Sequence, residues 1–329
     1  MVSYSGPYRK LPFLCSAFIA YFLIGTLDVD FQVPVNSRSP AANAKEIVDK
    51  AFAESANYVS EFRNLVSREK KTFKIFDKKG NLKRERTIVS NFLVYDLTNS
   101  KRSMTEFRSV LSVDGKTIAD SDKRAIDLFE RVSNSAASAN ELERIQKESL
   151  RFDEELRIYG LTLYQAIVLS DKVRDIFSFE VTGTERLGDA MAYVVRYRQT
   201  KQSPFVRVGE IRYDIPAILD YHMHLDGLEK INERLSGTLW IDTKSFQIVR
   251  EERKLTISPP EFSGPAIVAA NEFEYSPSVY GIRTPKYVKH TEYRIDKRSA
   301  RTLKHVEITF EYSDFTRPDV EVNAEKPTN

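Results

Sequence analysis

The side chains best suited to binding a metal ion are few in this sequence. His222 and His224 are two positions apart, so on a strand both imidazoles would face the same way, as two ligands of one metal ion would. A complete site needs three or four ligands, and the other histidines are His290 and His305. Strand alternation places both of these on solvent-facing positions, beside acidic residues. We therefore expect no metal site and no other cofactor.

The patterns that could carry catalysis are incomplete. Gly115–Thr117 resembles the end of a phosphate-binding loop, but Val110 stands where that motif requires glycine. The single cysteine, Cys15, lies in an N-terminal apolar run, which leaves no thiol nucleophile in a processed chain. The acidic pairs Glu154-Glu155 and Glu251-Glu252 would point to opposite faces of a strand. We expect no catalytic residues and no enzyme; polar residues that converge in a pocket would favour the enzyme alternative.

Charge is concentrated in one segment. The chain has 50 basic and 47 acidic residues, a net charge of +3, which is too balanced for a dedicated nucleic-acid binder. Residues 68–86 alone contain nine basic and three acidic residues. A solvated edge hairpin explains this composition. Alternatively, Lys78, Lys79, Lys83 and Arg84 contact anionic lipid headgroups at a membrane surface or an acidic envelope protein.

Strand patterns dominate the chain after about residue 70. Apolar and polar residues alternate in 177–181, 191–197, 211–215 and 306–312, which predicts antiparallel strands with one apolar face. These apolar positions form either plain core or the wall of a cavity for an apolar ligand. The predicted ligand-lining residues are Phe177, Phe179, Met191, Tyr193, Val195, Tyr197, Ile211, Tyr213, Ile308 and Phe310.

Helices are predicted in two places. Ile47, Ala51, Tyr58 and Phe62 recur at helical spacing and predict an amphipathic helix before the first strand. An insert near 121–170 contains two capping-box patterns, Ser138–Glu141 and Thr162–Gln165. Because helices are segregated from runs of strands, the pattern predicts an α+β fold.

The N-terminus has the pattern of an export signal. Arg9 and Lys10 precede the uncharged run 11–27, as in a secretory signal peptide. Ala42-Asn43-Ala44 offers a cleavage site, although an uncleaved anchor is an alternative. We expect residues 1–44 to be a signal peptide or anchor plus linker, 45–316 to be one domain, and 317–329 to be a flexible tail.

The residues of 235–257 carry a resemblance to a known family. A strand with the sequence Gly-Thr-Leu-Trp-Ile-Asp, at 237–242, is followed by a turn and a second strand at 248–250. This arrangement resembles the outer-membrane lipoprotein-sorting (LolA/LolB-like) superfamily, in particular its larger uncharacterised bacterial members. The similarity covers residues 175–257. It implies an antiparallel unclosed half-barrel sheet with helices covering the concave face, and no catalytic residues.

The resemblance also implies a function. Members of known role hold acyl chains between sheet and helices, so we expect an exported periplasmic protein of the cell envelope that binds a lipid or a lipoprotein acyl chain, carrier-like. With an uncleaved signal, the chain would be tethered to the inner membrane. The alternative is an envelope sensor or interaction protein of the same fold. The chain is longer than a typical carrier, and the insert near 121–170 and the connection 216–233 are additions.

Overall fold

The computed structural model divides the chain into two units, Met1–Ser39 and Pro40–Asn329, and all residues described below belong to the second. The described residues are 44–63, 65–96, 104–121, 123, 144, 147–154, 158, 160–163, 165–170, 173–201, 206–207, 221–222, 234–259, 262–296 and 298–317. The predicted signal segment and its cleavage site up to 43, the predicted strand 211–215 and the tail from 318 lie outside them.

The predicted N-terminal helix is confirmed as α1 (Ala44–Phe62). Its buried stripe repeats at three- and four-residue intervals and consists of Ile47, Val48, Ala51, Ser55, Tyr58 and Phe62. The opposite side carries ion pairs one turn apart, Lys45 with Asp49 and Lys50 with Glu46, both at 2.7 Å. Among the described residues, no helix is long and apolar enough to cross a lipid bilayer.

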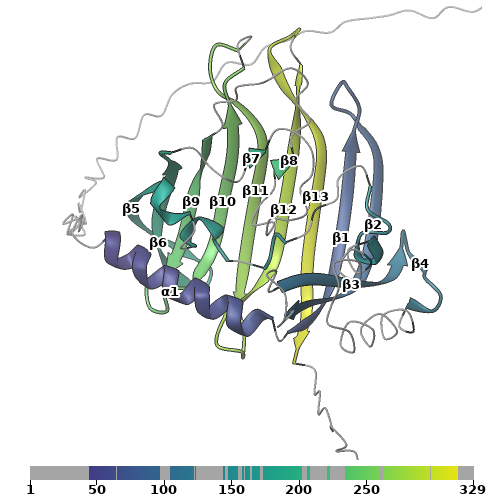
Figure 1. The fold of residues 1–329 in the computed structure, drawn as a ribbon, viewed down its shortest axis with the longest axis horizontal. Coiled ribbons are helices and arrows are strands. Elements are labelled where there is room, and N and C mark those ends of the chain that lie inside the picture. Colours follow the sequence, from purple (N-terminus) through teal and green to yellow (C-terminus); the bar gives the residue numbers. More distant parts are fainter. Residues whose placement is uncertain are drawn as a thin grey trace, which may run out of the picture. The chain divides into compact units, whose positions relative to one another are not determined.

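Eleven strands form one antiparallel sheet in the order β4-β3-β2-β1-β13-β12-β11-β10-β9-β6-β5 (Figure 1). Their bounds are β1 Val66–Phe76, β2 Leu82–Asp96, β3 Met104–Val113, β4 Lys116–Thr117, β5 Phe177–Leu187, β6 Ala190–Gln199, β9 Arg234–Asp242, β10 Ile248–Ile257, β11 Ala266–Pro277, β12 Arg283–Asp296 and β13 Arg301–Thr316. Strands β7 (Val206–Arg207) and β8 (Tyr221–His222) form a separate parallel pair. Within the described residues the edge strands β4 and β5 do not pair with each other, so the sheet is unclosed and the predicted fold class is confirmed.

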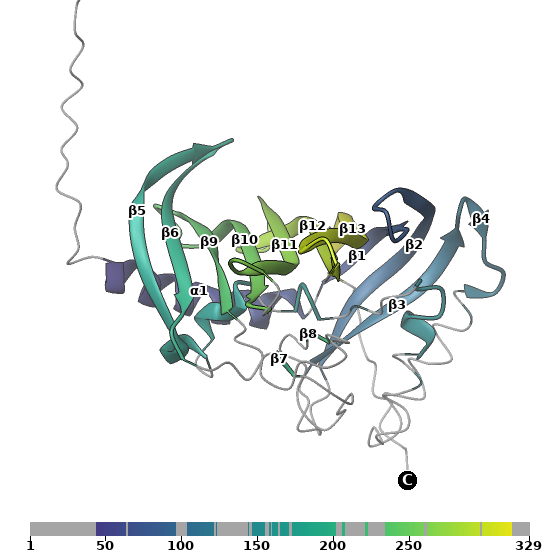
Figure 2. The ribbon, with the colours of Figure 1, turned by 90° about the horizontal axis from the view of Figure 1, so that it is seen from above.

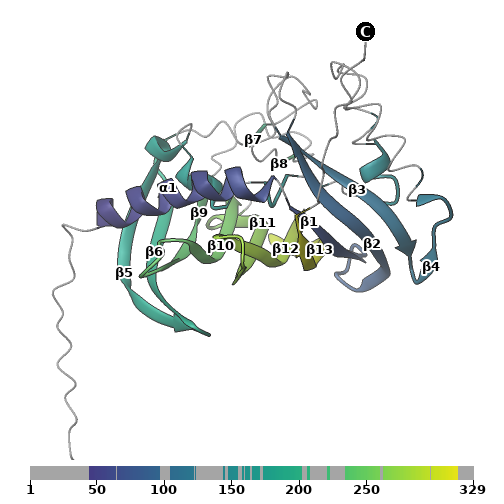
Figure 3. The same cartoon turned by 90° about the horizontal axis from the view of Figure 1, so that it is seen from below.

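Most strands have one buried and one more exposed face, as the sequence alternation predicts, whereas β4 and residues 182–186 of β5 are exposed on both faces. On β1, Glu69, Lys71 and Phe73 are buried while Arg68 and Lys70 are exposed. The register keeps the buried positions of neighbouring strands together, because Phe73 pairs with Ile308 of β13. We call the face that packs against α1 the inner face and the other the outer face. Figures 2 and 3 show α1 running across this one side of the sheet.

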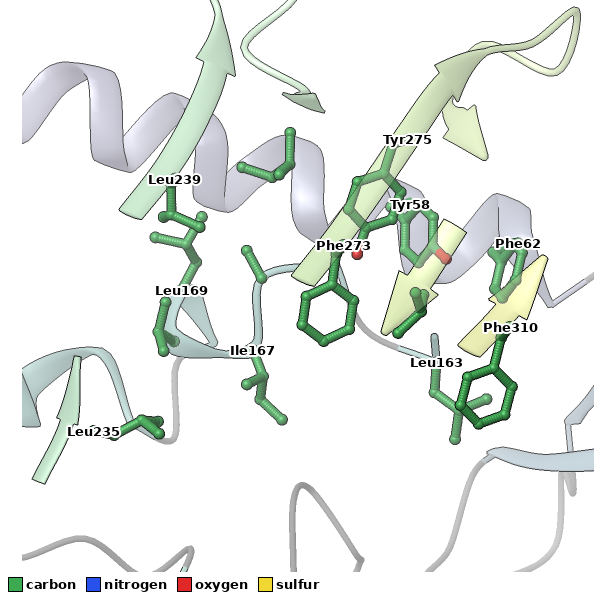
Figure 4. Packing of buried hydrophobic residues seen from close by; sticks show 14 of the residues in the cluster. Tyr58, Phe62, Leu163, Ile167, Leu169, Leu235, Leu239, Phe273, Tyr275 and Phe310 are labelled. Atoms are coloured by element: carbon green, nitrogen blue, oxygen red, sulfur yellow. The ribbon is translucent and has the colours of Figure 1, made fainter. Parts of the chain in front are cut away.

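The main hydrophobic core lies between α1, two short 3₁₀ helices and the inner face. The 3₁₀ helices are η1 (Ile167–Leu169) and η2 (Arg174–Ile176). Figure 4 shows Tyr58 of α1 beside Tyr275 of β11, with ring centroids 6.2 Å apart. At about 1.5 Å per residue, α1 is about 28 Å long, whereas eleven strands at a spacing of about 4.8 Å span about 48 Å. One helix therefore covers only part of the inner face.

The predicted insert near 121–170 lies largely outside the described residues, including the pattern at Ser138–Glu141. The prediction that Thr162–Gln165 forms a capping box is wrong. The helix that follows it, η1, is preceded by Ala166 and has no side-chain cap. The Thr162 hydroxyl instead donates to Glu106, and the Gln165 amide donates to the carbonyl of Ile248. Contacts with the inner face outweigh the local capping bonds in this segment.

The β9–β10 hairpin explains the glycine of the sequence motif. A Cβ at Gly237 would lie 2.0 Å from the carbonyl oxygen of Glu252 and 2.5 Å from the hydroxyl of Tyr197. Both distances are impossible for a real side chain, so only glycine allows β9 to pass this close to its neighbours. The bare backbone here leaves room for Tyr197 to reach β10.

The turn of this hairpin is held by the aspartate that ends the motif. Asp242 accepts the backbone N–H groups of Lys244 and Ser245 at 2.8 and 3.0 Å, and Arg283 donates to it at 3.0 Å. Burial by itself would raise the pKa of Asp242, but these hydrogen bonds outweigh it and hold that pKa below its ordinary value. The ionised carboxylate therefore stabilises the turn.

Candidate functional site

Partly exposed apolar side chains gather where α1 meets the edge strand β5. We call this set the apolar mouth: Phe52, Phe179, Val181, Tyr193 and Phe246. The helix and the strand are in contact there. The ring of Tyr193 on β6 stacks on Phe246, which lies in the β9–β10 turn, with centroids 6.3 Å apart. Four elements, α1, β5, β6 and the β9–β10 turn, therefore each contribute a partly exposed apolar side chain that packs against the core.

Fully buried residues form the floor of the apolar mouth. Phe177, Val195 and Tyr197 are 7%, 0% and 2% exposed. The rings of Phe177 and Tyr197 meet edge to face at 5.8 Å, and Phe179 lies 6.3 Å from Tyr197. The apolar surface thus continues from the solvent-accessible mouth into the core beneath α1.

Charged side chains stand at the rim of the mouth. Lys50 Nζ lies 4.8 Å from the centroid of the Phe246 ring, and the Arg174 guanidinium lies 4.7 Å from that of Phe52. Arg174 also pairs with Asp49 at 3.0 Å. The side-chain hydrogen bond from Lys45 is the main reason that the pKa of Asp49 lies below its ordinary value. The rim therefore presents cations directly over the apolar rings.

Beyond the floor, polar groups continue across the inner face. The Tyr197 hydroxyl donates to Glu251 at 2.8 Å, and Arg253 binds both oxygens of Glu251 at 2.9 and 2.8 Å. Burial raises the pKa of Tyr197, and the Glu251 carboxylate raises it further, so the hydroxyl keeps its proton. On the next two strands, Asn271 and His290 are hydrogen-bonded at 2.9 Å.

The buried position of His290 corrects the sequence-based expectation that this histidine faces solvent. It is 3% exposed and lies 3.4 Å from Glu292. Alternation separates the two faces of β12 but does not say which face is covered. The register decides it, because His290 pairs with Asn271 and Ile308, which both point to the inner face. His305 on β13 is half-buried and lies 2.7 Å from Arg294.

A second polar cluster is buried on the inner face at the β1–β3 side of the sheet. Arg108 binds both oxygens of Glu69 at 2.7 and 2.8 Å and donates to Glu106 at 2.8 Å. Burial alone would lower the pKa of Arg108, but these two carboxylates raise it well above its ordinary value. Burial would likewise raise the pKa of Glu69, and Arg108 lowers it instead. Arg108 and Glu69 therefore stay ionised.

A buried ion pair ties a segment between β4 and β5 to this cluster. Lys71 Nζ lies 2.8 and 3.0 Å from the two oxygens of Asp153, and the side chains are 2% and 1% exposed. Burial lowers the pKa of Lys71 and raises that of Asp153, so both charged forms are disfavoured. Next to it, the Tyr58 hydroxyl of α1 donates to the carbonyl of Thr162 at 2.7 Å. The segment is thus fixed to both the sheet and the helix.

The structure brings together five of the ten predicted ligand-lining residues. Phe177, Phe179, Tyr193, Val195 and Tyr197 lie in the mouth or its floor. Ile308 and Phe310 are buried on β13, which four strands separate from β6. Met191 is 46% exposed at the far end of β6, and Ile211 and Tyr213 lie outside the described residues.

Two members of the mouth are absent from the predicted set. Phe52 is on α1, three and four positions from buried residues, and its helical spacing could have indicated it. Phe246 sits in a turn with φ of 58°, a left-handed conformation that no local pattern around it predicts. Its contact with Tyr193 depends on how β9 and β6 pair.

The four predicted contact residues of the basic hairpin do not form one uniform surface. Lys78, Lys79 and Lys83 are exposed around the β1–β2 turn. Arg84 is also exposed, but it pairs with Glu154 from the segment between β4 and β5. Lys71, from the same basic segment, is buried.

Metal-binding clusters are absent from the described part of the chain, where no group of three or more His, Cys, Asp or Glu side chains could hold an ion. His222 ends β8, and His224 lies outside that part.

Three solved structures are similar to this chain over most of its length, each with a TM-score of 0.31. A DUF1329 family protein from Desulfovibrio piger is 12% identical, with 85% of this chain and 94% of that chain covered. A LolA superfamily protein from Nitrosomonas europaea is 11% identical, with coverages of 84% and 94%. An outer membrane lipoprotein-sorting protein domain from Vibrio parahaemolyticus is 8% identical, with coverages of 83% and 94%.

The superfamily to which the sequence shows a resemblance is thus represented among similar structures. No protein-family model and no curated protein sequence matches the chain. Identities of 8–12% do not transfer a ligand or an activity.

Proposed function

We propose that this chain is an exported protein of the cell envelope that binds an acyl chain of a lipid or lipoprotein in the apolar mouth, in the manner of a carrier. The observation that supports this most is the mouth itself. Its five apolar side chains come from α1, β5, β6 and a turn, and solvent reaches them although they adjoin the core. Exposed apolar surfaces are more often binding sites than polar surfaces are.

The position of the mouth at a free edge of the sheet favours an elongated apolar ligand. β5 pairs only with β6 in the described residues, so nothing in the sheet itself closes its other side. An acyl chain entering between β5 and α1 would lie on Phe179 and Val181 and continue toward the buried Val195. Each methylene removed from water would contribute about 0.8 kcal/mol.

The rim favours a ligand with an anionic head. Lys50 and Arg174 lie over the apolar rings, where a carboxylate or phosphate that remains in solvent would replace Glu46 and Asp49 as their partners. A fatty acid or a phospholipid has this combination of apolar tail and negative head. The apolar run and basic residues at the N-terminus support an envelope location, where these lipids are found.

Calorimetric titration of the full-length chain with palmitate tests the proposal. Wild-type protein is expected to bind, and Phe179→Asp, which introduces a charge into the mouth, is expected to weaken binding at least about tenfold. Val279→Asp is the matched control, because Val279 is an apolar residue that is 93% exposed in the β11–β12 turn. Equal affinities for wild type and Phe179→Asp, or no binding to wild type, would overturn the proposal.

A second candidate function is an envelope sensor or interaction protein that contacts an anionic membrane surface or an acidic protein. The exposed Lys78, Lys79 and Lys83 around one turn favour it. The triple charge reversal of these lysines to glutamate is expected to abolish sedimentation with anionic vesicles if the hairpin is the contact. Unchanged sedimentation would exclude this candidate.

A further inference from the structure

A polar groove of about 430 Å³ crosses the outer face of β5, β6, β9 and β10. The groove and the apolar mouth lie on opposite faces of the sheet, because the groove residues alternate with the inner-face residues of the same strands. Its volume falls within the range of small-molecule sites. The proposed acyl-binding function does not use it.

The strand register arranges the groove as two parallel rows. In the first row, Arg198 of β6 pairs with Ser236 of β9, which pairs with Lys254 of β10. Since neighbouring strands are about 4.8 Å apart, the backbones of Arg198 and Lys254 are separated by about 10 Å with only a serine between them. Two long cationic side chains therefore flank a floor made of a small hydroxyl residue.

The second row lies parallel to the first, two residues away from it on each strand. Arg196 pairs with Thr238, and Thr238 pairs with Glu252. Glu180 of β5 extends this row beyond Arg196. It offers carboxylates that accept hydrogen bonds and an arginine and a threonine that donate them, which is the mixture that sugar hydroxyls need.

The cations of the groove are available to a ligand. Arg196, Arg198 and Lys254 are exposed, and among the described residues none of them forms an ion pair with a carboxylate. The Arg198 Nε donates to the Ser178 hydroxyl at 3.3 Å, which holds the guanidinium at the β5 side of the groove, across from Lys254. On the same face, the outward lysines Lys70 and Lys289 are paired with Glu311 and Glu272.

We propose that this groove binds the phosphate monoester of a small polyhydroxylated molecule, a sugar phosphate, with the phosphate between Arg198 and Lys254. Two cations on opposite sides of one hydroxyl suit a group with close to two negative charges, which a phosphate monoester carries and a carboxylate does not. The guanidinium fork matches phosphate oxygens, and the ammonium adds a point charge. The second row receives the hydroxyls of the sugar.

Calorimetric titration of the full-length chain with glucose 6-phosphate, glucose and inorganic phosphate tests the assignment. Glucose 6-phosphate is expected to bind at least about tenfold more tightly than either of the other two probes. Arg198→Gln and Lys254→Gln are each expected to weaken its binding about tenfold or more, since each removes a charged hydrogen-bond donor. Lys74→Gln on β1 is the matched control and is expected to leave binding unchanged.

Four results would overturn the assignment. They are no binding of glucose 6-phosphate at about 10 mM, equal binding of glucose, equal binding of inorganic phosphate, and unchanged affinity in both groove variants. Binding to vesicles that contain phosphatidate, without binding of glucose 6-phosphate, would also overturn it in favour of a lipid surface. Because the groove and the apolar mouth lie on opposite faces, Phe179→Asp is expected to leave glucose 6-phosphate binding unchanged.

Discussion

Replacing Lys71 by methionine is expected to destabilise the protein strongly. The Asp153 carboxylate, whose side chain is 1% exposed, would lose the ammonium group 2.8 Å away. Removing one partner of a buried ion pair costs about 3–5 kcal/mol of unfolding free energy, because the remaining charge is left without compensation. The double variant Lys71→Met/Asp153→Leu removes both charges and is expected to recover most of this loss.

The sign of the pH dependence separates the two single variants. Without Lys71, the already raised pKa of Asp153 rises further, so Lys71→Met is most stable at low pH and loses stability as pH rises through that pKa. Without Asp153, the already lowered pKa of Lys71 falls further, so Asp153→Leu is most stable at high pH and loses stability as pH falls through that pKa.

Urea unfolding at pH 6 and pH 8 measures both effects, because the single tryptophan, Trp240, reports on the sheet. Wild type and the double variant serve as references for the pH dependence of the remaining groups. The reasoning is refuted if Lys71→Met costs less than about 1 kcal/mol, or if both single variants change stability with pH in the same direction.

Three further variants test contacts of the β9–β10 hairpin. Gly237→Ala places a Cβ 2.0 Å from the Glu252 carbonyl and is expected to lower the unfolding free energy by more than about 3 kcal/mol. Tyr197→Phe removes one of the two hydrogen bonds that Glu251 Oε1 accepts, the other coming from Arg253, and is expected to cost about 1–3 kcal/mol because the lost bond goes to a charged group. Asp242→Asn is expected to cost about 1–2 kcal/mol at neutral pH. The lowered pKa means that the contribution of Asp242 is present above the unfolded-state pKa of about 4 and is lost as pH falls through the folded-state value.

Urea unfolding measures the free energy of unfolding of all three variants, and for each prediction one result would contradict it. Wild-type stability of Gly237→Ala would mean that β9 is not held close to its neighbours. A Tyr197→Phe variant as stable as wild type would show that the hydroxyl does not satisfy Glu251. If Asp242→Asn lost as much stability below pH 3 as at pH 7, the carboxylate would not be the stabilising form.

The sequence predicts local features well where one periodicity decides them. The spacing of Ile47, Ala51 and Tyr58 predicts α1, and the alternation in 177–181 and 191–197 predicts the hairpin that carries three of the five residues of the apolar mouth. These patterns depend only on which face a residue occupies along its own element. These elements can therefore be predicted without knowing which strands are their neighbours.

Features that depend on the pairing of distant strands could not be predicted. Arg108 of β3 pairs with Phe92 of β2, yet it reaches Glu69 of β1, whose own partner on β2 is the small buried Ser90. His290 is buried because of its partners on β11 and β13. The alternation around Phe73 does place Lys71 on the buried face, but its partner Asp153 is 82 residues away.

Photo-crosslinking with a diazirine-labelled fatty acid, followed by peptide mapping of the full-length chain, tests the central claim most directly. Acyl binding in the apolar mouth predicts modification of Phe179, Tyr193 or Phe246 and its loss when unlabelled palmitate is added in excess. Modification confined to Ile308 and Phe310 of β13, or to the outer face, would contradict the claim. So would labelling that excess palmitate does not reduce.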